Sequence, residues 1–118
     1  VRIISNAVLE KALQIYTGDL QNQFHARLAN SLGWEVPPAN LGLGFSITGG
    51  GLAFRMFGTL TSPRTYGNNG AGSTVFWVDP ERDITFVCLT APVIGEEENM
   101  IRFQRLSDMI ASATILKE

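Results

Sequence analysis

The sequence predicts an α/β fold of the α+β type, in which helices flank an antiparallel sheet. Two runs rich in β-branched and aromatic residues, Ser73–Val78 and Ile84–Leu89, are separated by a short polar segment, as in a β-hairpin. The last segment, Glu96–Leu116, has the apolar spacing of a helix. The chain has 118 residues, 45% of them hydrophobic, which is enough for one core. No internal repeat or charged linker divides it, so we expect residues 1–118 to form one contiguous unit.

The amino-terminal third predicts one short helix followed by a loop. Ser5 is the expected N-cap, and Gly18 ends the helical pattern. The apolar residues between them at helical spacing are Val8, Leu9, Ala12, Leu13, Ile15 and Tyr16. From Asp19 to Asn40 the pattern breaks up around Trp34 and the Pro37-Pro38 pair, which predicts a surface loop with room for one turn of helix.

Two further strands are predicted before the hairpin. Leu41–Thr48 alternates apolar and small residues with period two, as a half-buried strand does. Gly49–Gly51 then predicts a turn, and Leu52–Phe57 a second, shorter strand. A loop at Ser62–Arg64 leads into a glycine-rich stretch.

The hairpin itself carries apolar residues on both faces. Asp79–Asp83 contains the proline and aspartates that favour a type I turn between its strands. Within the first strand, alternate residues point to opposite sides, with Val75 and Trp77 on one face and Phe76 and Val78 on the other. Each face therefore needs a cover.

The predicted terminal helix covers one of the two apolar faces of the hairpin. Glu96, Glu97 and Glu98 begin this helix, where the unpaired N–H groups and the helix dipole favour carboxylates, so a metal cluster is not needed to explain them. The predicted buried stripe is Met100, Phe103, Leu106, Ile110 and Ala113. The second face implies partner sequence outside this chain, and the start at Val1 rather than methionine suggests a piece of a longer polypeptide.

Composition excludes several functions. The net charge is −2 without a basic stripe, so nucleic acid is not an expected partner. No run of about 18 apolar residues is present, so the chain holds no predicted membrane segment. The single cysteine, Cys88, is expected as a buried strand residue, and no metal site is predicted. The single histidine, His25, is expected to be an ordinary surface or half-buried residue.

One segment has the composition of a site. Tyr66–Ser73 combines glycines with the entrance to a strand, where glycine lets a ligand approach and leaves backbone N–H groups accessible. Such groups can form an oxyanion hole. Two other interpretations stay open: a glycine cluster needed only for tight turning, and a phosphate-binding loop, which the absence of a following lysine and helix disfavours.

The same segment carries a resemblance. Tyr66–Gly72, followed by Phe76–Asp83, resembles the third active-site motif and following hairpin of serine β-lactamase-like and penicillin-binding-protein-like hydrolases, especially their esterase branch. The resemblance implies the carboxy-terminal part of the β-lactamase/transpeptidase-like fold. It also implies that the nucleophile, the serine of Ser-x-x-Lys, lies in an amino-terminal portion of the same protein, and that no cofactor is needed.

The resemblance matches single residues of this sequence to positions of the family's third motif. Asn68 falls on the lysine or histidine of the family's third motif, Asn69 on its middle residue and Gly70 on its glycine. Ala71 then falls on the residue whose N–H completes the oxyanion hole. The resemblance thus implies Ala71 and Gly70 as catalytic, and Tyr66, Asn68, Asn69 and Gly72 as substrate-binding.

Asn68 departs from the family pattern. A lysine there would meet a substrate carboxylate, whereas asparagine offers a neutral amide, which disfavours β-lactamase or carboxypeptidase activity and leaves small ester or amide substrates. The expected function is one wall of a serine hydrolase that is inactive without its nucleophile. The alternative is a non-catalytic binding protein that keeps the fold. Residues expected to line a pocket are Trp34, Phe57 and Tyr66.

Overall fold

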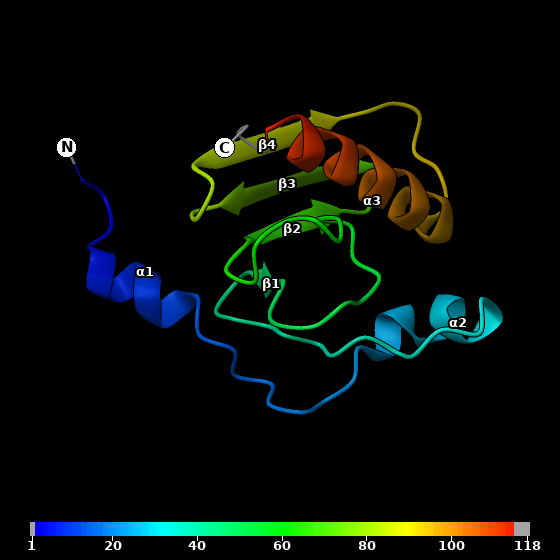
Figure 1. The fold of residues 1–118 in the computed structure, drawn as a ribbon, viewed down its shortest axis with the longest axis horizontal. Helices are drawn as coiled ribbons and strands as arrows, with labels where there is room; N and C mark the ends of the chain where they lie inside the picture. The colour runs from blue at the N-terminus through cyan, green and yellow to red at the C-terminus, as the bar shows by residue number, and fades with distance from the viewer. Residues whose placement is uncertain (1, 115–118) are drawn as a thin grey trace.

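The computed structural model describes residues 2–114 and confirms the α+β class. The elements are α1 (Asn6–Ala12), α2 (Gln23–Ser31), β1 (Ser46–Ile47), β2 (Tyr66–Gly70), β3 (Thr74–Asp79), β4 (Ile84–Leu89) and α3 (Glu96–Ala113). The strands form one antiparallel sheet in the order β1-β2-β3-β4. Figure 1 shows α3 lying along β3 and β4, whereas α1 and α2 lie at the β1 side. Of the helices within residues 2–114, none combines the length and apolarity needed to cross a bilayer.

The predicted hairpin is confirmed. β3 and β4 pair along their whole lengths, with Trp77 opposite Phe86 and Phe76 opposite Val87. The turn between them is fixed by Asp79, whose fully buried carboxylate accepts hydrogen bonds from the backbone N–H groups of Glu81 and Arg82 at 3.1 and 3.3 Å. The β-branched and aromatic runs therefore do form the strands that their composition predicts.

The core lies between the sheet and α3. Trp77 is fully buried, and its indole Nε1–H donates to Ser107 Oγ of α3 at 2.9 Å. The Ser107 hydroxyl in turn donates to the backbone carbonyl of Met56 at 2.8 Å. The fully or largely buried apolar residues of this cluster are Leu28, Phe54, Met56, Phe57, Val75, Trp77, Met100 and Phe103. Cys88, expected to be buried, is half-buried and packs against the same cluster.

The opposite face of the sheet is open within the described residues. Phe76, Val87 and Leu89 are 36%, 59% and 77% exposed there. Their cross-strand pairing places them in adjacent rows of the same face, so they form one continuous apolar surface. The expectation that both faces are apolar and that α3 covers one of them agrees with this arrangement.

The region predicted as a loop contains the helix α2. Asn22 caps it, since its Oδ1 accepts from the N–H groups of Phe24 and His25 at 3.1 and 3.3 Å. Its end is a Schellman motif, in which Gly33 has φ 68° and the Trp34 N–H donates to the Ala29 carbonyl at 2.9 Å. The prediction for residues 19–40, a loop with room for one turn of helix, was therefore wrong in the length of the helix, which has nine residues.

Two predicted strands are largely wrong. In the segment Leu41–Thr48, only Ser46–Ile47 forms a strand, because the chain folds back at Gly44, with φ 81°, so that Leu41 bridges Ser46. The segment Leu52–Phe57 forms no strand. Phe54, Met56 and Phe57 instead turn inward to fill the core, which irregular backbone permits as well as a strand does, whereas Leu52 is exposed.

Both predicted helices at the chain ends need correction. Ser5 does cap α1, but the helix ends at Ala12 rather than near Gly18, since the backbone of Ala12 and Tyr16 bonds to the 41–43 segment. In α3 the helix ends at Ala113, which is exposed, while Ala111 is buried in its place. The last predicted helical residues, 115 and 116, lie outside the described residues.

Candidate functional site

The predicted site segment is the strand β2 followed by a tight turn. β2 pairs with β3 along its whole length, but β1 covers only Tyr66 and Gly67 on its other edge. A side chain at Gly67 would overlap the Phe76 carbonyl oxygen and lie 2.8 Å from Trp77 Cα, so this glycine is required for the pairing. The edge beyond Gly67 is left without a neighbouring strand in the described part of the chain.

The two asparagines of the motif point to opposite faces. Asn68 is exposed, and its Oδ1 accepts from the Asn69 N–H at 3.0 Å, while its Nδ2 lies 3.4 Å from the Gly44 carbonyl. Asn69 instead reaches toward α3, with Nδ2 3.4 Å from Glu96 Oε1. The Asn68 amide is thus engaged by its own strand edge and its neighbouring loop.

Ala71 lies in the turn that joins β2 to β3. Gly70 pairs with Thr74, so the turn consists of Ala71, Gly72 and Ser73. Ala71 and Gly72 are exposed, and Ser73 has a left-handed φ of 63°. Among residues 2–114, nothing accepts a hydrogen bond from the Ala71 N–H. The residue that the resemblance implies as an oxyanion donor is therefore exposed, and its N–H is free of hydrogen bonds to the described residues.

A buried polar network behind this turn was not predicted. Ser73 is fully buried, and its Oγ accepts from the Ile94 N–H at 2.9 Å and from Asn99 Nδ2 at 3.1 Å. Its carbonyl accepts from Thr90 Oγ1 at 2.6 Å. Arg102 completes the network by donating from Nε to Asn99 Oδ1 at 3.0 Å and by contacting Thr90 Oγ1. These partners are 17–26 residues from Ser73 in sequence, so no local pattern reveals them.

The hollow beside the motif is shallow and open. Asn68, Asn69 and Gly70 line a cavity of about 260 Å³ on the outer side of the sheet, together with the apolar residues Phe76, Val87 and Leu89. Tyr66 lies elsewhere, in a hollow of about 240 Å³ between α1 and the hairpin turn. Asn68, Asn69 and Gly70 thus line one hollow, although the two asparagine side chains point to opposite faces, and Tyr66 does not line it.

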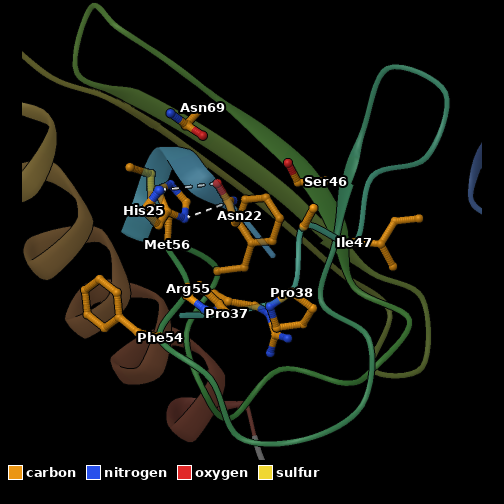
Figure 2. A pocket seen from close by; sticks show the side chains of 12 residues that line it. Asn22, His25, Pro37, Pro38, Ser46, Ile47, Phe54, Arg55, Met56 and Asn69 are labelled. Atoms are coloured by element: carbon orange, nitrogen blue, oxygen red, sulfur yellow. Dashed lines mark hydrogen bonds between the residues drawn. The ribbon is translucent and has the colours of Figure 1, made fainter. Parts of the chain in front are cut away.

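The cavity in Figure 2 lies on the other side of β2 and is too small for a substrate. Its volume is about 40 Å³, room for little more than water. His25 lies in its wall, with Nδ1 3.2 Å from Asn22 Nδ2, and burial lowers the pKa of His25 below its ordinary value. A neutral imidazole fits the half-buried residue that the sequence predicts. The guanidinium of Arg55 also lines this cavity, and burial lowers its pKa too.

The other predicted pocket residues, Trp34 and Phe57, do not line the hollow beside the motif. Trp34 packs on Phe54 with ring centroids 4.9 Å apart and lines a pocket of about 660 Å³ with Pro37 and Leu52. Phe57 lines the small cavity beside His25, to which Asn69 of the motif also contributes. In the part of the chain that the structure describes, no cluster of three or more histidine, cysteine or acidic residues could hold a metal ion.

Comparison with known proteins gives two kinds of match. No protein-family profile matches the chain. Two curated proteins named putative D-alanyl-D-alanine carboxypeptidase, from Escherichia coli strains K12 and O157:H7, are 37% and 36% identical over 70 residues. That alignment covers 56% of this chain and 16% of each relative.

A solved structure matches almost the whole chain. It is a β-lactamase from Mycobacterium bovis, with a TM-score of 0.74 and 26% sequence identity. The match covers 96% of this chain and 39% of that one. The chain therefore spans about two fifths of this structural relative and a smaller share of the curated ones.

Proposed function

We propose that the chain forms one wall of the active site of a serine acyl hydrolase of the β-lactamase and penicillin-binding-protein-like family, which its similarity to these relatives supports. Residues 1–118 are then the carboxy-terminal portion of a single β-lactamase-like domain. The nucleophile, a serine in Ser-x-x-Lys, belongs to an amino-terminal portion of the same protein, and the chain alone is inactive. This partner would also cover the open apolar face of the sheet, where Val87 and Leu89 are exposed.

The free N–H of Ala71 carries the proposal. In acyl transfer, the serine oxygen attacks the substrate carbonyl, and negative charge develops on the carbonyl oxygen. A backbone N–H that already points at this oxygen stabilises the tetrahedral intermediate without reorganising. The intermediate collapses to an acyl-enzyme as the leaving group departs, and water then releases the acid and the serine. Ala71 is accessible, lies at the open end of β2, and forms no competing hydrogen bond to any described residue.

Asn68 favours a neutral ester or amide as the substrate. The relatives' names point to substrates of carboxypeptidases and β-lactamases, but Asn68 offers no cation at the position where the family places one. Its amide oxygen and nitrogen are also both directed to the backbone of Asn69 and Gly44. The apolar side chains Phe76, Val87 and Leu89 line the same hollow and suit an acyl group without charge.

The same observation supports a second candidate function. An Asn68 side chain that is engaged by its own chain, and that carries no charge, is compatible with a binding protein that has kept the fold and lost the chemistry. The two functions differ in whether the protein turns over an ester.

Replacing Ala71 tests the proposal. Ala71 is the first residue of a hairpin turn that Ser73 completes in the left-handed region, a position where proline is tolerated. In the complete protein, Ala71→Pro removes the N–H, and we expect turnover of a neutral nitrophenyl ester to fall by roughly a hundredfold or more. Ala71→Gly keeps the N–H and should retain turnover. Equal rates for the two variants would contradict the assignment, and an inactive parent protein would favour the binding function.

A further inference from the structure

The turn that carries Ala71 is held in an unfavourable conformation. Ser73 has a φ of 63°, a region that residues with a side chain seldom adopt. Gly72, beside it, has open space around it and would tolerate a side chain. The backbone therefore places its strained residue at Ser73, and such strain persists only where the surroundings determine the conformation.

Those surroundings are the first turn of α3 and the segment before it. Ser73 Oγ accepts from the Ile94 N–H and from Asn99 Nδ2, at 2.9 and 3.1 Å. Asn99 is only 2% exposed, and Arg102 fixes its orientation by donating to its Oδ1. The Asn99 amide can therefore present only its nitrogen to Ser73.

The other end of the turn is tethered to the same part of α3. Asn69 precedes the turn by two residues, and its Nδ2 lies 3.4 Å from Glu96 Oε1. Ala71 thus lies midway between two residues that both contact α3. Small displacements of an oxyanion donor strongly reduce its effect, because the hydrogen bond must match the position of the developing charge.

We propose that Ser73 and Asn99 are positioning residues, which hold the Ala71 N–H at the edge of β2 in the orientation that an oxyanion requires. This inference rests on the proposed function of Ala71. It adds that the donor's direction is set by the contact between Ser73 and α3, and not by the strand alone.

The same helix offers a matched control. Ser107 is also a fully buried serine with two hydrogen bonds, to Trp77 Nε1 and the Met56 carbonyl. It lies two helical turns farther along α3, away from the 71–73 turn. Loss of either hydroxyl should destabilise the fold, but only loss of the Ser73 hydroxyl should disturb Ala71.

The test compares Ser73→Ala, Asn99→Leu and Ser107→Ala in the complete protein. Asn99→Leu has nearly the size of asparagine but can neither donate to Ser73 nor accept from it, so it supplies a second variant if one folds poorly. We expect the first two to lower kcat by roughly tenfold or more, with KM changed by less than about twofold. The amide NMR resonance of isotope-labelled Ala71 should shift in both. Ser107→Ala should lower the melting temperature and leave both kcat and this resonance unchanged.

Two readouts keep the outcomes distinct. If the parent protein turns over ester and the Ser73 and Asn99 variants match Ser107→Ala in kcat and in the Ala71 resonance, the positioning role is refuted while the proposed function stands. If the parent protein has no activity, the proposed function fails. The Ala71 resonance then decides by itself whether Ser73 and Asn99 orient that amide.

Discussion

Asp79 is the buried charge on which the hairpin depends most, and replacing it by asparagine should destabilise the fold strongly. Its carboxylate is fully buried and accepts four hydrogen bonds: from Ser62 N–H at 2.8 Å, from Ser62 Oγ at 2.7 Å, and from the N–H groups of Glu81 and Arg82. Hydrogen bonds to a charged group contribute about 1.5–3 kcal/mol each. Asparagine keeps the shape, but its NH2 group would face a donor, so we expect a loss of about 2–4 kcal/mol.

The pH dependence of stability gives an independent check on Asp79. Burial alone would raise the pKa of its carboxyl, but the hydrogen bonds from Ser62, Glu81 and Arg82 outweigh burial and hold this pKa below its ordinary value. A carboxyl whose pKa is lowered by folding stabilises the protein above its unfolded pKa of about 3.9. This stabilisation is lost as the pH falls through the lower, folded value.

Urea denaturation followed by tryptophan fluorescence measures both effects. The matched control is Asp83→Asn, which removes an exposed carboxylate from the same turn, at a left-handed position that asparagine tolerates. We expect Asp79→Asn to lower the free energy of unfolding near neutral pH and to weaken its decline below about pH 4. If Asp79→Asn unfolds at the same urea concentration as Asp83→Asn, the reasoning about the buried carboxylate is wrong.

Two further substitutions test the sheet. Gly67→Ala should cost at least about 2 kcal/mol in the same denaturation assay, because its Cβ would meet the backbone of Phe76 and Trp77, whereas Gly72→Ala, with open space around it, should cost far less. Leu89→Lys should reduce self-association of the isolated chain in sedimentation velocity, since Leu89 is 77% exposed on the apolar face of the sheet. The control Leu52→Lys, at a residue that is 87% exposed away from that face, should reduce self-association less. The reverse order would show that self-association does not use the apolar face of the sheet.

The parts of the fold that the sequence predicted are those decided by local pattern. The β3–β4 hairpin and α3 combine strong propensity with clear turn and capping residues, so their bounds were predicted nearly as the structure has them. The helix α2 is longer than the single turn that was predicted, although Asn22 and Gly33 are suitable cap residues, because Trp34 and the prolines that follow make the second half of the same segment irregular.

The errors arise where tertiary contacts override alternation. Leu41–Thr48 has the period of a strand, but its glycines let the chain fold back toward Ser46. Within Leu52–Phe57, the side chains of Phe54, Met56 and Phe57 fill the core, and irregular backbone is enough to place them there. Periodicity alone does not separate these cases.

The candidate site also contains residues that a local motif reveals and residues that only a tertiary contact reveals. Asn68, Asn69, Gly70 and Ala71 were located by their resemblance to a motif, and their roles stay predictions. The buried contact between Ser73 and Asn99 joins residues 26 positions apart. Since neither residue belongs to a local pattern, only the folded structure brings them together.

Labelling with a fluorophosphonate tests the central claim most directly. The complete protein and the isolated 118-residue chain would each be treated with the probe, and the modified peptide identified by mass spectrometry. The account predicts one labelled serine in the complete protein, within Ser-x-x-Lys and outside these residues, and no labelling of the isolated chain. Labelling of a serine within this chain, or no labelling of the complete protein, would contradict it.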